Sequence, residues 1–160
     1  MNAVCTRILI QIIFPVKNRK NMIPLQNLDE VFECIAGIIH NKEQNPIVVG
    51  GTSTHIHALV ELTPEIVFST LIREIKNESA KFINQKKWLA DKFSWHNDSG
   101  IFSYSFSQIE KVCDYIRNQS VYHKTMTFRE EFVAYLNKFD VEYNENELPP
   151  DFEKGLVAKV

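Results

Sequence analysis

The stretch THIHALVEL, residues 54–62, alternates in the way that a half-buried β-strand does. Side chains two positions apart in a strand lie on the same face, and the face that runs from Ile56 to Leu62 is wholly apolar. His55 and His57 therefore lie together on the other face, where their imidazole nitrogens can bind a divalent cation. The pattern predicts either a metal site on a strand or two hydrogen-bonded histidines on the surface of a sheet.

The composition is typical of one small domain. The chain has 160 residues, of which 44% are hydrophobic, and this is sufficient for a single core. No stretch reaches the roughly 18 to 20 apolar residues that cross a membrane, so we expect no membrane partner. The three cysteines are scattered and form neither a disulfide framework nor a Cys-x-x-Cys motif, which favours a cytoplasmic location.

Acidic residues are concentrated at the C-terminal end, although the formal net charge is only −2. From Arg129 onward there are four basic and eight acidic residues, which leaves 14 basic against 12 acidic before that point. We therefore expect a single domain in residues 1–140 and an acidic tail in residues 141–160. Four basic side chains of the domain are either contacts for DNA phosphates or ordinary solvated residues: Lys17, Arg19, Arg73 and Lys76. Gln11 of the first expected strand is a further candidate for contact with DNA.

Hydrophobic periodicity predicts the order strand, helix, strand, strand, helix, strand, followed by two further helices. The strands are expected at 5–16, 46–50, 54–62 and 101–106. The helices are expected at 25–41, at 107–123 and at 127–138, and one more is expected to begin at Pro64. That helix is followed by a surface loop at 86–100. We expect Gly50 and Gly51 to turn the second strand into the third. Glu130 follows Thr127 by three residues, a capping box that predicts the start of the last helix.

This order is that of a ferredoxin-like βαββαβ sheet, an α+β fold with helices on one face, here with additional C-terminal helices. The first and third strands are central neighbours in that fold. The two histidines are then expected in the middle of the sheet, on the face that the helices leave open, with Gln11 of the first strand close by.

The helix expected at 107–123 supplies a second group of polar residues. Tyr115 and Gln119 lie one turn apart along one edge of it. Glutamine offers a hard oxygen ligand, and tyrosine offers an oxygen nucleophile beside a metal ion. The alternative is that Tyr115 only packs at the helix edge, with its hydroxyl in water. Tyr122 is a second candidate nucleophile, and the remaining histidines, among them His123, are expected at the surface.

Three segments together resemble the small single-tyrosine transposases of the HUH nuclease superfamily, those of the insertion sequence 200/605 group, which include the REP-associated tyrosine transposases. They are GGTSTHIHALV at 50–60, DYIRNQ at 114–119 and TFREEF at 127–132. The resemblance runs from about Arg7 to Phe152. It implies that His55, His57 and Gln119 bind Mg²⁺ or Mn²⁺ and that Tyr115 is the catalytic nucleophile.

The resemblance also implies a function. It implies a metal-dependent DNA transposase that cleaves and rejoins single-stranded or hairpin DNA through a 5′-phosphotyrosine intermediate, and it implies a homodimer. One nucleophile per chain is a separate physical reason to expect two chains, because two simultaneous strand exchanges need two tyrosines.

Two positions depart from the family pattern. Thr54 stands where members often have an acidic residue, and Gln11 stands where they often have a histidine. These departures keep a second hypothesis open, a domesticated, non-cleaving protein of the same fold that binds DNA hairpins. A phosphoesterase of the two-histidine type is a third, but its second motif would be His123-Lys124-Thr125, which falls at the end of a helix.

Overall fold

The computed structural model describes residues 5–151 and 153. Its four strands form one antiparallel sheet in the order β2-β3-β1-β4. They are β1 (Ile8–Pro15), β2 (Asn45–Thr52), β3 (His55–Leu62) and β4 (Gly100–Tyr104). The ferredoxin-like βαββαβ fold is confirmed, with β1 and β3 at the centre as predicted.

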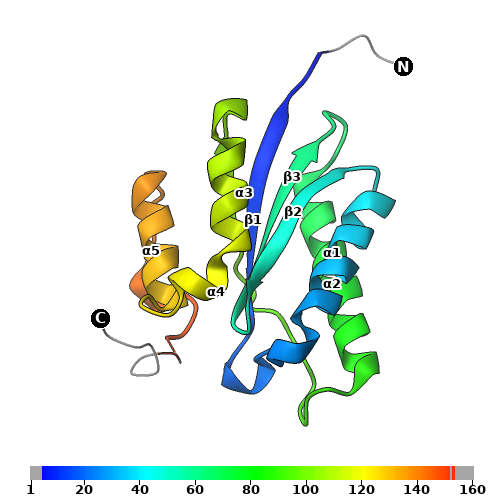
Figure 1. The fold of residues 1–160 in the computed structure, drawn as a ribbon, viewed down its shortest axis with the longest axis vertical. Coiled ribbons are helices and arrows are strands. Elements are labelled where there is room, and N and C mark those ends of the chain that lie inside the picture. The colour runs from blue at the N-terminus through cyan, green and yellow to red at the C-terminus, as the bar shows by residue number, and fades with distance from the viewer. Residues whose placement is uncertain (1–4, 152, 154–160) are drawn as a thin grey trace.

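Helices cover both faces of this sheet (Figure 1). On one face lie the two helices of the βαββαβ unit, α1 (Leu28–Asn41) and α2 (Phe68–Lys86). On the other lie the additional helices, α3 (Ile109–Arg117), α4 (Gln119–Tyr122) and α5 (Phe128–Lys138). The expectation that the histidine face is open was therefore wrong, because the C-terminal helices pack onto it.

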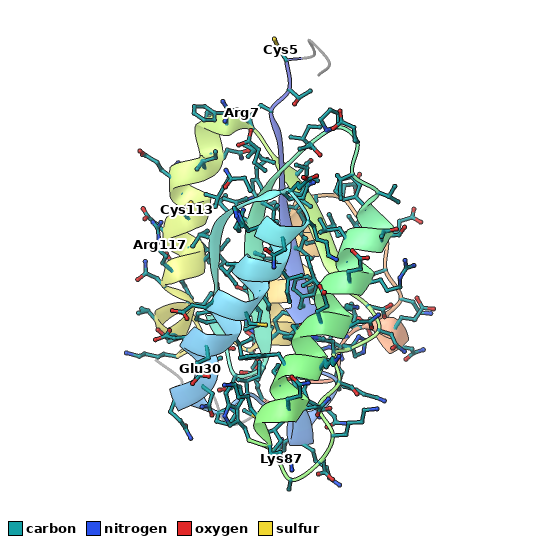
Figure 2. The ribbon with its side chains drawn as sticks, turned by 90° about the vertical axis from the view of Figure 1, so that its right-hand side faces the viewer. Cys5, Arg7, Glu30, Lys87, Cys113 and Arg117 are labelled. Carbon is teal, nitrogen blue, oxygen red and sulfur yellow. The ribbon has the colours of Figure 1, made fainter. Side chains whose placement is uncertain are left out.

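The larger part of the hydrophobic core lies between the sheet and the first helix layer. The apolar face predicted for β3, from Ile56 to Leu62, is buried there against the inner faces of α1 and α2. Figure 2 views the molecule from the side of these two helices, with Lys87 marking the end of α2. Two smaller apolar clusters lie on the other face, one around Ile13 and α5 and one around Leu59 and α3.

The helix predicted at 107–123 is interrupted at Asn118, whose backbone (φ −104°, ψ 23°) leaves the helical region. The Asn118 side chain donates to the carbonyl of Asp114 at 2.7 Å, and the backbone N–H of Asn118 donates to the same carbonyl at 3.1 Å. The segment also begins differently, with a 3₁₀ turn at Phe106–Gln108 that Ser105 and Gln108 cap. The predicted cap of α5 is confirmed, since the Thr127 side chain accepts from the backbone N–H of Glu130.

The turn between β2 and β3 also differs from the prediction. β2 continues through Gly50 and Gly51 to Thr52, so the turn falls at residues 53–54. Glycine is needed at position 50 for packing, because a Cβ there would lie 2.6 Å from the carbonyl oxygen of Ile116 in α3. The glycine thus lets α3 approach the sheet closely.

The segment predicted as a surface loop at 86–100 contains buried side chains. Trp95 is buried against Phe14, and its indole N–H donates to Ser79 Oγ at 2.9 Å. Pro64 precedes α2 in a separate turn, so the prediction that it opens the helix was wrong. Within the part of the chain that the structure describes, no helix combines the length and apolarity that a membrane crossing needs.

Candidate active site

The two histidines of β3 are completely buried, and their rings lie 4.9 Å apart between centroids. His55 Nδ1 lies 2.9 Å from the hydroxyl of Thr54, and His57 Nδ1 lies 2.7 Å from the side-chain nitrogen of Gln11. Each ring thus has one nitrogen held by its own sheet. The Nε2 atoms of both rings are directed at a common point between β3, α4 and α5, as the contacts below show.

α4 and α3 bring the other two predicted residues to the same point. Gln119 is buried, and its oxygen lies 2.8 Å from His55 Nε2. Tyr115 is half-buried, one turn earlier, and its hydroxyl donates to a carboxylate oxygen of Glu131. Tyr122 is 45% exposed, and its ring packs at a tilt against that of Tyr115, with 4.7 Å between centroids. Of the two candidate nucleophiles, Tyr115 is therefore the one that contacts the cluster.

Glu131 lies at the centre of the cluster, and the sequence reasoning missed it. Its side chain is 1% exposed, and its Oε1 lies 3.1 Å from His55 Nε2 and 3.2 Å from His57 Nε2. Its Oε2 accepts hydrogen bonds from Tyr115 and, at 3.0 Å, from Gln119. The signal that could have revealed Glu131 is its place in the helix, because this acidic residue falls within the apolar stripe that packs α5 against the sheet.

His123, which was predicted at the surface, also belongs to this cluster. Its side chain is 5% exposed, and its Nε2 lies 3.2 Å from Glu131 Oε1. The short connection between α4 and α5 folds back over His55, whose ring lies 4.6 Å from that of His123 between centroids. Spacing along the sequence gave no hint of this contact, because His123 lies more than 60 residues from His55.

The electrostatics of the cluster follow from burial and from these contacts. Burial alone would raise the pKa of Glu131, but the neighbouring histidines outweigh it and hold this pKa well below its usual range. Burial lowers the pKa of His55 to about 4, in spite of the carboxylate beside it. Burial together with Glu131 raises the pKa of Tyr115. The site therefore combines a buried anion with a neutral imidazole and a protonated phenol.

This donor set fits a divalent metal ion. His55, His57 and Glu131 each offer one ligand atom, and these atoms all lie within 4.8 Å of one another. The Gln119 oxygen adds a fourth donor of a type that such ions accept. A cation here would also neutralise a carboxylate that is almost entirely removed from water, where an unpaired charge is costly.

Gln11 supports the cluster from β1, as its position in the sheet predicted. Its side chain is completely buried, and its oxygen accepts a hydrogen bond from the Tyr104 hydroxyl at 2.9 Å. Its nitrogen lies 2.7 Å from His57 Nδ1 and donates to the Tyr135 hydroxyl at 3.2 Å. Gln11 thus fixes the orientation of the His57 ring: Nδ1 accepts from the amide nitrogen, so Nε2 carries the hydrogen that is directed at Glu131 Oε1.

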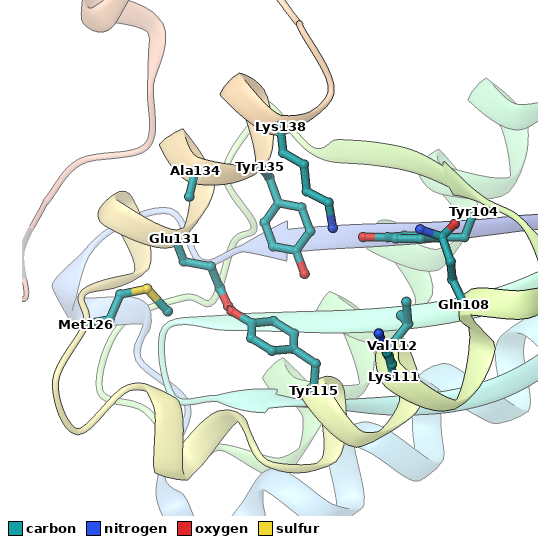
Figure 3. Close-up of a pocket in the computed structure, with 10 residues that line it drawn as sticks. All are labelled: Tyr104, Gln108, Lys111, Val112, Tyr115, Met126, Glu131, Ala134, Tyr135 and Lys138. Atoms are coloured by element: carbon teal, nitrogen blue, oxygen red, sulfur yellow. The ribbon is translucent and has the colours of Figure 1, made fainter.

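A cavity of about 320 Å³ opens beside Tyr115. Figure 3 shows the Tyr115 hydroxyl and the Glu131 carboxylate meeting at one end of it. Lys111 of α3 and Lys138 of α5 also line it, together with the rings of Tyr104 and Tyr135. The cavity therefore offers positive charge and aromatic surface next to the candidate nucleophile.

The four basic residues predicted to contact phosphate lie elsewhere, since none of them lines this cavity. Arg73 and Lys76 line a groove along α2, and the Lys76 amine donates to the carbonyls of His96 and Asn97 at 3.0 Å each. Lys17 and Arg19 are exposed just after β1, where the backbone N–H of Lys17 donates to the carbonyl of Ser94 in the wall of that groove.

Comparisons with known proteins agree with this fold. The chain has the fold of a proposed transposase from Deinococcus radiodurans R1, with a TM-score of 0.59 and 16% identity over 74% of this chain and 95% of the other. It is also similar to a REP-associated tyrosine transposase bound to a REP hairpin, with a TM-score of 0.56 and 15% identity over 77% and 74%. No curated protein sequence matches.

The family comparison is the more specific one. Residues 4–119 match the model of the family described as "Transposase IS200 like". The match includes the histidine pair, Tyr115 and Gln119, and it ends before His123 and Glu131. Because it spans well over half of the sequence, the chain belongs to the IS200-like transposase family.

Proposed function

We propose that this protein cleaves and rejoins single-stranded DNA, with Tyr115 as the nucleophile and a divalent metal ion bound by His55, His57, Gln119 and Glu131. One observation carries the proposal. The hydroxyl of Tyr115 and the buried metal-binding donors meet at the same side chain, because the two oxygens of Glu131 face the nucleophile and the histidines respectively. A purely structural histidine pair would not need a tyrosine hydroxyl at this point.

The proposed reaction is a transfer of a phosphodiester bond to the protein. Tyr115 Oη attacks the scissile phosphorus, the phenol proton leaves along its hydrogen bond to Glu131 and is released to water, and the bond from phosphorus to the 3′ oxygen breaks. The products are a 5′-phosphotyrosine and a 3′-hydroxyl, which takes a proton from water. A metal ion bound here supplies positive charge beside the phosphate. Attack by another 3′-hydroxyl reverses the reaction and joins new ends.

The raised pKa of Tyr115 bears on this step. In the metal-free protein the phenol stays protonated, because burial and the adjacent carboxylate both disfavour a phenolate. A metal ion at the histidines would offset the negative charge of the carboxylate and lower the pKa of the phenol. Metal is therefore required for the nucleophile as well as for the phosphate, in this proposal.

We propose that the DNA strand enters by the cavity beside Tyr115. In this proposal Lys111 and Lys138 would contact phosphates near the scissile bond, and the rings of Tyr104 and Tyr135 would offer a surface for a base. We propose that a neighbouring DNA hairpin contacts the basic residues along or near the α2 groove, which are Arg73, Lys17 and Arg19. Lys76 lies in the same groove, but its amine is mainly engaged with backbone carbonyls.

We also propose that the protein is a homodimer. Size-exclusion chromatography with light scattering tests this.

The decisive experiment is the capture of the covalent intermediate. Single-stranded oligonucleotides that cover the sequences flanking the gene, labelled at the 3′ end, are incubated with the protein and Mg²⁺ or Mn²⁺. We expect a labelled protein adduct that EDTA and Tyr115→Phe abolish and that Tyr122→Phe leaves intact. An adduct that survives Tyr115→Phe and is lost with Tyr122→Phe would reassign the nucleophile.

A second candidate function is a DNA hairpin binder that does not cleave. The observation that favours it is the complete burial of both histidines under the C-terminal helices. This candidate predicts hairpin binding that EDTA does not affect and no adduct with any flanking sequence.

A further inference from the structure

The nitrogen atoms of His123 have unequal environments. Nδ1 lies 2.7 Å from the backbone carbonyl oxygen of Met126. Because a carbonyl oxygen only accepts hydrogen bonds, Nδ1 carries the hydrogen, and in a neutral ring Nε2 presents its lone pair. Metal-binding histidines are commonly held in this way, with the far ring nitrogen donating to a backbone carbonyl.

The environment of His123 Nε2 is unusual for a lone pair. The atom is buried and makes no hydrogen bond, yet it lies 3.2 Å from Glu131 Oε1, which is an acceptor as well. Two acceptors at this distance repel each other in a site that water does not reach. The contact becomes favourable only if a proton on Nε2 or a metal ion beside both atoms supplies positive charge.

The distances fit a metal ion beside these atoms. Glu131 Oε1 lies 3.1, 3.2 and 3.2 Å from the Nε2 atoms of His55, His57 and His123. Two ligands at right angles around an ion, with bonds of about 2.1 Å, lie about 3.0 Å apart. His123 thus stands in the same relation to the carboxylate oxygen as the two histidines of β3 do.

We propose that His123 is a third imidazole ligand of the metal site, and that this site consequently binds Mn²⁺ and Co²⁺ more tightly than Mg²⁺. Imidazole suits transition metals, whereas Mg²⁺ prefers oxygen ligands. With three imidazoles, one carboxylate and one amide oxygen, the donor set is mainly nitrogen. The inference rests on the metal site of the proposed function and extends it to a residue beyond the part matched by the family model.

Metal titration of the full-length chain tests the proposal. The protein is stripped with EDTA, and its affinities for Mn²⁺ and Mg²⁺ are measured by calorimetry. The test variant is His123→Asn, which keeps a donor for the Met126 carbonyl but lacks Nε2, and the control is His40→Asn at an exposed position of α1. We expect the variant to weaken Mn²⁺ binding by at least about tenfold, with a smaller effect on Mg²⁺, and the control to change neither.

The Co²⁺-loaded protein provides a spectroscopic readout. Its visible absorption bands should shift in His123→Asn, because one nitrogen ligand is lost. Pulsed EPR of the Mn²⁺-loaded wild type should detect three coupled histidine nitrogens, a measurement that does not depend on a variant folding. Two coupled nitrogens, an unchanged Co²⁺ spectrum, or an equal loss of Mn²⁺ and Mg²⁺ affinity would overturn the proposal.

These outcomes are separate from those of the proposed function. If the wild-type chain binds no divalent ion, the metal site itself is wrong. If it binds Mn²⁺ through three imidazoles but never forms a DNA adduct, then the role of His123 holds and strand cleavage does not.

Discussion

At the scale of single residues, Glu131 links the parts of the site. One of its oxygens faces the histidines, and the other accepts hydrogen bonds from Tyr115 and Gln119. A single side chain therefore connects β3, α3, α4 and α5. This arrangement makes the charge of Glu131, more than its size, the property on which metal binding depends.

Glu131→Gln tests this dependence. At a Mn²⁺ concentration of 100 times Kd, we expect the ion to raise the free energy of unfolding of the wild type by about 2.7 kcal/mol. The variant keeps the shape of the side chain but loses its charge, so most of this increase should disappear. Urea denaturation with and without Mn²⁺ measures the effect. Glu142→Gln, at an exposed position, is the control, and an unchanged increase in Glu131→Gln would contradict the prediction.

Gln11 is the second residue whose replacement should have a clear effect. In Gln11→Leu, the Tyr104 and Tyr135 hydroxyls and His57 Nδ1 lose the amide that they contact. Leaving buried polar groups without partners costs about 1–3 kcal/mol each, so we expect a loss in this range or larger in urea denaturation. Tyr104→Phe removes only one hydroxyl and should cost less. A variant as stable as the wild type would show that water replaces the amide.

At the scale of elements, the contact between β2 and α3 sets the position of Tyr115, the proposed nucleophile. α3 carries Tyr115 and approaches the sheet at Gly50, next to the carbonyl of Ile116. The helix can come this close only because position 50 has no side chain. The glycine at position 50 in β2 therefore helps to set the position of Tyr115 in α3.

Gly50→Ala should be destabilising for this reason. The new Cβ would lie 2.6 Å from the Ile116 carbonyl oxygen and 3.0 Å from its Cγ2, so α3 must move away, at a cost of about 1–3 kcal/mol. Gly37→Ala in α1 is the matched control, because no atom lies within 4 Å of its Cβ position. It should stabilise the helix by up to about 1 kcal/mol. Urea denaturation compares the two, and equal effects would contradict this view of Gly50.

The elements also show what the sequence could and could not predict. The alternation in β3 was sufficient for the strand, its buried face and the histidine pair. The break at Asn118 is a local change of backbone conformation, which hydrophobic periodicity does not report. Glu131 and His123 were missed because they join the site through the tertiary packing of α5 and of the connection that precedes it. Within α5 alone, Glu131 is simply an acidic residue between apolar ones.

At the scale of the whole molecule, the sheet separates two layers with different tasks. The layer of α1 and α2 buries most of the apolar core, whereas the layer of α3, α4 and α5 covers the polar cluster. Sequence order alone predicted the topology, because consecutive elements pair in few ways. It did not predict which face the C-terminal helices cover.

Hydrogen exchange should distinguish the two layers. A metal ion would connect β3 to α4 and α5, so adding Mn²⁺ to stripped protein should slow exchange in α4 and α5. Exchange in α1 and α2 should change little, because neither helix contributes a donor. Mass spectrometry of peptic fragments resolves the elements. A uniform decrease across both layers would indicate global stabilisation instead.

The burial of His55 and His57 has a kinetic consequence. An ion bound to rings without solvent exposure can leave only when α5 moves, and such local opening takes microseconds to seconds. The rate at which the metal ion exchanges with solvent then depends on how firmly α5 docks, and not on the strength of the bonds to the ion. A chain that acquires its ion before α5 docks would retain it through later dilution, and its metal content would record the conditions under which it folded.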